Sequence, residues 1–252
     1  MSTVLPTPRR PGTAGFSRFS PGMLAFLRGL KRHNQREWFQ PRKHEYERLV
    51  REPMVALVDR LAHEFESFAP ELLASPRTSL FRIYRDTRFS ADKSPYKTAI
   101  GAVFPNRTLP KTGGAGLYLE VAPEHVWIGG GMYRPSSPEL HLVREHIVAH
   151  QATLERLVHA AGFCRTFGEV SGDKLQRVPR GFPVDHPAGE WLRHRQFLAF
   201  VEKPAEFATS PGFFRSVIRV FRTLVPLVAF LNEPLVAAQS HGALQRGWKD
   251  SQ

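Results

Sequence analysis

The sequence contains one cysteine, Cys164, among 252 residues. A single thiol excludes a disulfide within the chain and excludes zinc or iron–sulfur sites that are built from several cysteines. The sequence also lacks an apolar run long enough to span a membrane, because residues 217–231 are interrupted by Arg219, Arg222 and Pro226. These absences predict a cytoplasmic protein without a membrane partner.

Familiar catalytic and cofactor motifs are missing as well. The chain has no HExxH, no P-loop, no dinucleotide-binding glycine motif and no G-x-S-x-G nucleophile. His146 and His150 have the i, i+4 spacing of a shared ligand pair, and a second group of ligand types consists of Asp185, His186 and His194. Neither group is a complete motif. We therefore expect no metal site, and the sequence assigns no cofactor and no catalytic residue.

What the chain has in excess is positive charge. Lys and Arg number 35 against 23 Asp and Glu, which gives a formal net charge of +12 and raises the local concentration of anions. The hydrophobic content of 42% is sufficient for one buried core. We predict a single domain over residues 19–235, preceded by a disordered basic tail over 1–18 and followed by a polar tail over 236–252.

Helix signals are clear on both sides of the middle of the chain. Ser20 before Pro21, and Ser136 before a second proline, are typical of helix starts. Apolar residues at helical spacing predict helices over residues 23–30, 46–68, 140–158 and 211–231. We expect a kink or a restart at Pro53 and a helix end at Gly162.

Between these helices the apolar period changes to two, which is typical of strands. Four short segments show it: SLFRIYR, TAIGAVFP, GAGLYLEVA and EHVWIGGGMY. Short links favour an antiparallel meander, with a tight hairpin between Val121 and Val126. The predicted fold class is α+β, in which an antiparallel sheet of about four strands is flanked by long helices that cover its apolar face.

The segment RDTRFSADKSPYKTAIG, residues 85–101, mixes cationic, acidic and aromatic side chains more densely than any other part of the sequence. Guanidinium groups and ammonium groups that converge would bind a phosphate or a carboxylate, and the aspartates would orient the arginines. The alternative is a solvated loop or an internal Arg–Asp network. The predicted ligand-binding residues here are Arg82, Arg85, Asp86, Arg88, Lys93, Tyr96 and Lys97.

Two further segments are candidates for supporting walls of the same site. The run Gly129-Gly130-Gly131 could expose backbone N–H groups to an anion, with Gly130 and Gly131 as ligand-binding residues, or could let the strand pass close to its neighbours. Lys174, Arg177 and Arg180 form a second cationic group in an irregular, proline-containing region, which could equally be a surface loop. The sequence does not show whether the three blocks meet.

Several motifs resemble those of one protein family. HNQREWF, FRIYRDTRFSADKSPYKTAIG, GLYLEV, GGGMYRP and GDKLQRVPRGFPVDHP are similar to the signatures of the family called domain of unknown function 2461, which occurs in bacteria and some fungi. The resemblance covers about residues 19–231. It implies one full-length domain, and it carries over no activity, cofactor or catalytic residue to any position.

Three functional hypotheses remain open. The first is a protein that binds an anionic small molecule through the basic segment. The second is a nucleic-acid-binding module in which Phe81, Tyr84, Phe89 and Tyr96 stack on bases beside the cations, although alternation places Phe81 in the core. The third is an enzyme acting on a phosphorylated compound.

Overall fold

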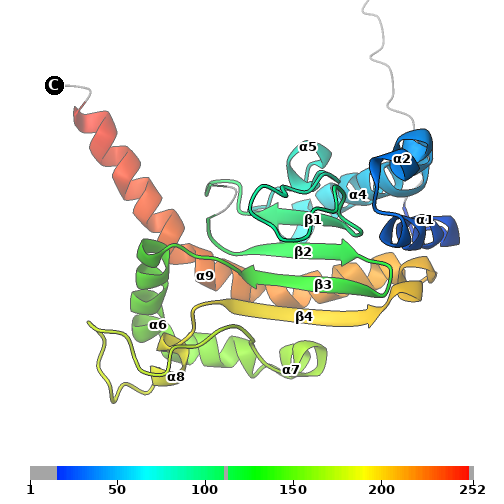
Figure 1. The fold of residues 1–252 in the computed structure, drawn as a ribbon. Coiled ribbons are helices and arrows are strands. Elements are labelled where there is room, and N and C mark those ends of the chain that lie inside the picture. The colour runs from blue at the N-terminus through cyan, green and yellow to red at the C-terminus, as the bar shows by residue number, and fades with distance from the viewer. Residues whose placement is uncertain (1–15, 111–112, 250–252) are drawn as a thin grey trace, which may run out of the picture.

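The computed structural model describes residues 16–110 and 113–249, and it is built on one antiparallel sheet. Its strands are β1 (Ile100–Pro105), β2 (Gly116–Val121), β3 (His125–Met132) and β4 (Phe197–Pro204). They lie side by side in the order of the sequence, and each pairs with the next (Figure 1). The α+β fold class is confirmed, and the predicted hairpin is present with Val121 opposite Val126.

Helices surround this sheet on one side and at its ends (Figure 1). Ser20 begins the first helix by accepting a hydrogen bond from Met23 N, and Ser136 begins another with a capping box to Glu139. The helices are α1 (Pro21–Arg32), α2 (Arg36–Phe39), α3 (Lys43–Tyr46), α4 (Glu52–Phe68), α5 (Pro76–Ser79), α6 (Ser137–Val158), α7 (Ala161–Phe167), α8 (Gly189–Leu192) and α9 (Phe213–Lys249).

One face of the sheet is covered by helices. Alternate strand residues, among them Phe104, Leu119 and Ile128, point to this face and are essentially fully buried. The ring of Phe104 packs against Phe65 of α4 and Phe221 of α9, with ring centroids 5.3 and 5.7 Å away. α9 runs behind β2 and β3 and supplies most of the cover (Figure 1).

A buried asparagine fixes α9 to the beginning of β2. Asn232 accepts a hydrogen bond from Ala115 N at 2.7 Å and donates one to Ala115 O at 2.9 Å. Its side chain is 2% exposed, so these bonds satisfy polar groups that have no access to water. The helix and the sheet are therefore joined by a specific polar contact as well as by apolar packing.

The other face of the sheet is only partly covered. Tyr118, Glu120, Trp127 and Phe200 alternate with the core residues and are partly or largely accessible to solvent. The rings of Tyr118 and Phe200 meet edge to face at 6.3 Å. We call this surface the open face, and over its β1 side lies the irregular segment that links α5 to β1.

The four strands are not the four segments that the sequence indicates. Residues 79–85 form no continuous strand and make isolated bridges at Leu80–Ala102 and Tyr84–Tyr96. Between these bridges, residues 81–83 oppose the longer stretch 97–101, so the two segments cannot stay in register. The fourth strand is instead β4, which pairs with β3 and comes from a region in which the sequence predicted no strand.

Three local expectations have different outcomes. A π-helical segment, Glu47–Arg51, leads directly into α4 at Glu52, so the hydrogen-bonding pattern changes just before Pro53 but the helix does not restart there. Gly162 does not end a helix, because α6 already ends at Val158 and Gly162 lies within α7. Of the predicted basic tail, residues 1–15 lie outside the described residues, and the predicted polar tail begins within α9.

Candidate functional site

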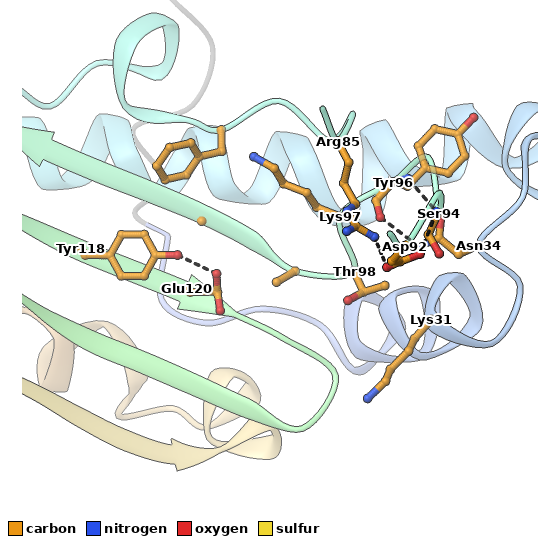
Figure 2. Close-up of a pocket in the computed structure, with 13 residues that line it drawn as sticks. Lys31, Asn34, Arg85, Asp92, Ser94, Tyr96, Lys97, Thr98, Tyr118 and Glu120 are labelled. Atoms are coloured by element: carbon orange, nitrogen blue, oxygen red, sulfur yellow. Dashed lines mark hydrogen bonds and ion pairs between the residues drawn. The ribbon is translucent and has the colours of Figure 1, made fainter. Parts of the chain in front are cut away.

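A cleft of about 700 Å³ lies between the basic segment and the open face (Figure 2). Its walls come from the end of α1, the segment before β1, and the first two strands. The residues that line it are Lys31, Asn34, Phe81, Arg85, Asp92, Ser94, Tyr96, Lys97, Thr98, Ala99, Gly101, Tyr118 and Glu120. Three of the seven residues predicted in the basic segment, Arg85, Tyr96 and Lys97, are among them.

The basic segment is anchored to the helices by Asn34. Its side chain donates to Tyr96 O at 2.9 Å and accepts from Tyr96 N at 3.0 Å, which replaces the strand partner that this residue lacks on that side. The Tyr96 ring is 1% exposed and packs on Phe39 at 4.2 Å. Tyr96 therefore holds the cleft in place as a core residue, and its ring is not a free ligand contact.

The acidic residues of the segment pair with its arginines. Asp86 accepts two hydrogen bonds from Arg88, at 3.0 and 2.7 Å, and Asp92 forms an ion pair with Arg85. Hydrogen bonds from Arg88 hold the pKa of Asp86 below its usual value. The pKa of Asp92 is lowered by hydrogen bonds from Ser94 and Arg85. These Arg–Asp pairs fit both an orienting role for the aspartates and the alternative of an internal network.

The remaining cations of the segment fall into two groups. Lys93 Nζ donates to Thr87 O at 3.0 Å, outside the cleft, and thereby braces the tip of the loop. Lys97 is half-buried within the cleft, and its Nζ lies 4.9 Å from the centre of the Phe81 ring. Within residues 16–110 and 113–249, no carboxylate lies at ion-pairing distance from Lys97 or from the exposed Arg82.

Electrostatics set Lys97 apart from the other lysines of the segment. Burial lowers the pKa of Lys97, the positive charge of Arg82 lowers it further, and the negative charge of Glu120 partly opposes both. A cation that is desolvated and close to a like charge gains free energy when an anion arrives. Lys97 is therefore a partly desolvated cation of the cleft that lies near a like charge.

Two residues on β2 belong to the cleft although sequence reasoning did not select them. Tyr118 donates a hydrogen bond to Glu120 Oε2 at 2.6 Å, and His125 Nε2 lies 3.4 Å from Glu120 Oε1 (Figure 2 shows the first contact). Burial, and then the Glu120 carboxylate, raise the pKa of Tyr118. The signal was present in GLYLEV, where a tyrosine and a glutamate occupy the positions that alternate with three core residues.

The glycine run on β3 does not line the cleft. A Cβ on Gly130 would lie 2.1 Å from Gly116 O, and one on Gly131 would lie 1.9 Å from Phe197 O. Gly131 also has a φ of 122°, which L side chains rarely adopt. These glycines allow β2, β3 and β4 to approach closely, which is the structural alternative considered for them.

The second cationic group lies apart from the first. Lys174 lines a cleft of about 220 Å³ with Trp191 and His194, and its Nζ is 3.9 Å from Glu190. This cleft shares no lining residue with the larger one, and its segment lies beyond the β4 edge of the sheet (Figure 1). Arg177 and Arg180 are exposed in that segment. The structure therefore does not bring these three residues to the cleft.

Neither metal-ligand group of the sequence forms a centre. The rings of His146 and His150 lie 4.5 Å apart, but no group of three or more His, Cys, Asp or Glu side chains gathers as a metal site within the described part of the chain. Among the same residues, no helix is both long and apolar enough to cross a membrane.

Comparison with known proteins identifies the family of the chain. No curated protein and no solved structure matches the chain. The family model described as conserved hypothetical protein (DUF2461) matches residues 22–230, which include α1, the basic segment, all four strands and most of the cover over the sheet. Because this match spans most of the sequence, the chain belongs to the DUF2461 family.

Proposed function

We propose that the protein binds a small ligand bearing a phosphate or carboxylate group in the cleft, with Lys97 as the principal contact. The observation that supports this most is the environment of Lys97, which is half-buried beside Arg82 and has no carboxylate partner among the described residues. An anion at this point would compensate both positive charges. A charge-assisted hydrogen bond of this kind stabilises a complex by about 1.5–3 kcal/mol.

Arg85, which comes from the same segment as Lys97 and also lines the cleft, supports the same anion. Its guanidinium carries five N–H donors and contacts Asp92 and Ser90 within the described part of the chain, so donors remain for a ligand. Asp92 fixes the guanidinium in place and thereby reduces the entropy that binding would cost. Arg88 and Lys93 act at longer range, through their charge.

The test is a thermal-shift screen of the full chain against inorganic phosphate, sugar phosphates and dicarboxylates at two salt concentrations. A ligand that binds only the folded protein raises its melting temperature. We expect a phosphate compound to stabilise the wild type, and we expect Lys97→Gln to weaken its affinity by about 10- to 100-fold without loss of the fold.

Lys203→Gln is the matched control, because Lys203 is exposed on β4 and its loss removes the same charge far from the cleft. It should bind as the wild type does. If Lys97→Gln responds to the anions as the wild type does, or if no anion stabilises the wild type, the basic segment is a structural network and the proposal is wrong.

A second candidate function is binding of single-stranded nucleic acid, and exposed aromatic residues around the basic segment favour it. Phe89 is 96% exposed at the loop tip with Arg88 above its ring at 5.8 Å, and Tyr84 is 44% exposed. In the same screen, oligonucleotides would then stabilise the protein more than small phosphates do, and the effect would decline steeply with salt because binding releases counterions. A cytoplasmic location stays a prediction.

A further inference from the structure

The cleft contains a carboxylate that a site for anions alone does not need. Glu120 lies on β2 with its side chain 21% exposed, and it faces the same cleft as Lys97. Tyr118 donates to one of its oxygens, which leaves acceptor capacity on both oxygens. A polyanion that filled the cleft would be repelled here. A donor group on the ligand would instead find a charged acceptor.

Lys97 and Glu120 are close enough to influence each other but do not touch. The Glu120 charge acts on Lys97, yet no ion pair joins them at 4.0 Å or less. A lysine and a glutamate that share a cleft without pairing leave a gap between two opposite charges. A ligand that spans the gap gains at both ends, provided that its anion meets Lys97 and its N–H donor meets Glu120.

Two aromatic rings, tilted by 60° to each other, line the cleft beside these charges. Phe81 is 39% exposed, and its ring centroid lies 6.2 Å from that of Tyr118. Gly101 lies beneath the two rings, where a Cβ would come within 3.2 Å of the Tyr118 hydroxyl and 3.4 Å of Phe81. The absence of a side chain at Gly101 leaves room beneath the two rings, and a planar ring would pack against them.

From these three features we infer that the ligand is a nucleoside monophosphate. The inference rests on the proposed function and deepens it. The phosphate binds at Lys97 and Arg85, the base packs along Phe81 and Tyr118, and an N–H group of the base donates to Glu120. A cleft of about 700 Å³ lies within the range of small-molecule sites. The carboxylates of Glu120 and Asp92 disfavour a longer phosphate chain.

Isothermal titration with matched probes tests the inference. The four common nucleoside 5′-monophosphates supply a ring, a donor and an anion, whereas ribose 5-phosphate supplies the anion alone. We expect at least one nucleotide to bind the wild type about tenfold or more tightly than ribose 5-phosphate does. In Glu120→Gln, the amide oxygen accepts from Tyr118 and the amide N–H₂ replaces the oxygen beside His125, so the charged acceptor is lost and this advantage should disappear.

The nucleotides and ribose 5-phosphate test the nucleotide inference and the anion-binding function separately. Glu120→Gln should bind ribose 5-phosphate at least as well as the wild type does, because a negative charge is lost near the anion. Glu202→Gln, which removes an exposed carboxylate from the same face on β4, should retain nucleotide preference. If ribose 5-phosphate and every nucleotide bind equally, or if Glu120→Gln keeps the preference, this inference alone fails. If no probe binds the wild type, the anion-binding function fails with it.

Discussion

The two faces of the sheet are formed by the same four strands, yet they have opposite properties. On the covered face Phe104, Leu119 and Ile128 are sealed by α4 and α9, and no polar side chain alternates into that layer along β2. On the open face Tyr118 and Glu120 occupy the neighbouring positions and reach solvent. One strand can therefore contribute to the buried core on one face and to the cleft on the other, because successive side chains point to opposite sides.

The largest expected effect comes from truncating a leucine on each face. Leu119→Ala should lower the free energy of unfolding by about 3 kcal/mol, because it removes buried methyl groups and leaves a cavity. Leu198→Ala, a matched change at a partly exposed position of β4 on the open face, should cost about 1 kcal/mol. Urea denaturation measures both. Equal losses would contradict the division of roles between the faces.

An intermediate effect is expected at Gly131 of β3, where the neighbouring backbone leaves no room for a side chain. Gly131→Ala should lower the free energy of unfolding by about 2 kcal/mol, because the new Cβ meets Phe197 O and the backbone has a positive φ. Gly162→Ala is the control, since no atom lies within 4 Å of its Cβ position and alanine favours the helix. It should be neutral or slightly stabilising. A tolerated Gly131→Ala would contradict the role of this glycine in the close approach of β3 and β4.

The smallest expected effect is a pH dependence on the covered side. His146 of α6 packs on Phe230 of α9, and burial lowers its pKa below 6.5, with Glu233 opposing the shift and His150 adding to it. Below pH 6.5 the unfolded chain takes up a proton first, so stability that is complete above this pH is lost as the pH falls towards the lowered pKa.

Melting temperature measured across this interval should fall less in His146→Gln than in the wild type. Some slope should remain, because burial also lowers the pKa of His194. The aspartates of the basic segment do not interfere, since they titrate below 3.8. An unchanged slope in the variant would show that His146 remains solvated between α6 and α9.

Local signals predicted much of the fold. The caps at Ser20 and Ser136 and the hairpin at Val121 depend on a few neighbouring residues, and all three are present. The prediction of which segments form the sheet was wrong where contacts between distant parts of the sequence decide the pairing. β4 is a strand because it pairs with the free edge of β3, which is distant from it in the sequence. Residues 79–85 have the apolar alternation of a strand, but they lose register against residues 97–101.

The sequence predicted two cations of the candidate site, but it did not predict the β2 residues that line the cleft. Arg85 and Lys97 were selected by charge alone, and both line the cleft. Glu120 was not selected, because a carboxylate is not expected in a site that binds anions. Lys174, Arg177 and Arg180 were grouped with it by charge, but only tertiary structure shows that they lie beyond the β4 edge.

The position of α9 has a consequence for how the protein is made. β1, β2 and β3 leave the ribosome well before residues 197–231, which supply the fourth strand and most of the cover. A nascent chain at that stage presents an apolar sheet surface and an unpaired strand edge, both of which attract chaperones and other unfinished chains. The sheet is therefore completed only late in translation, when α9 can pack behind it.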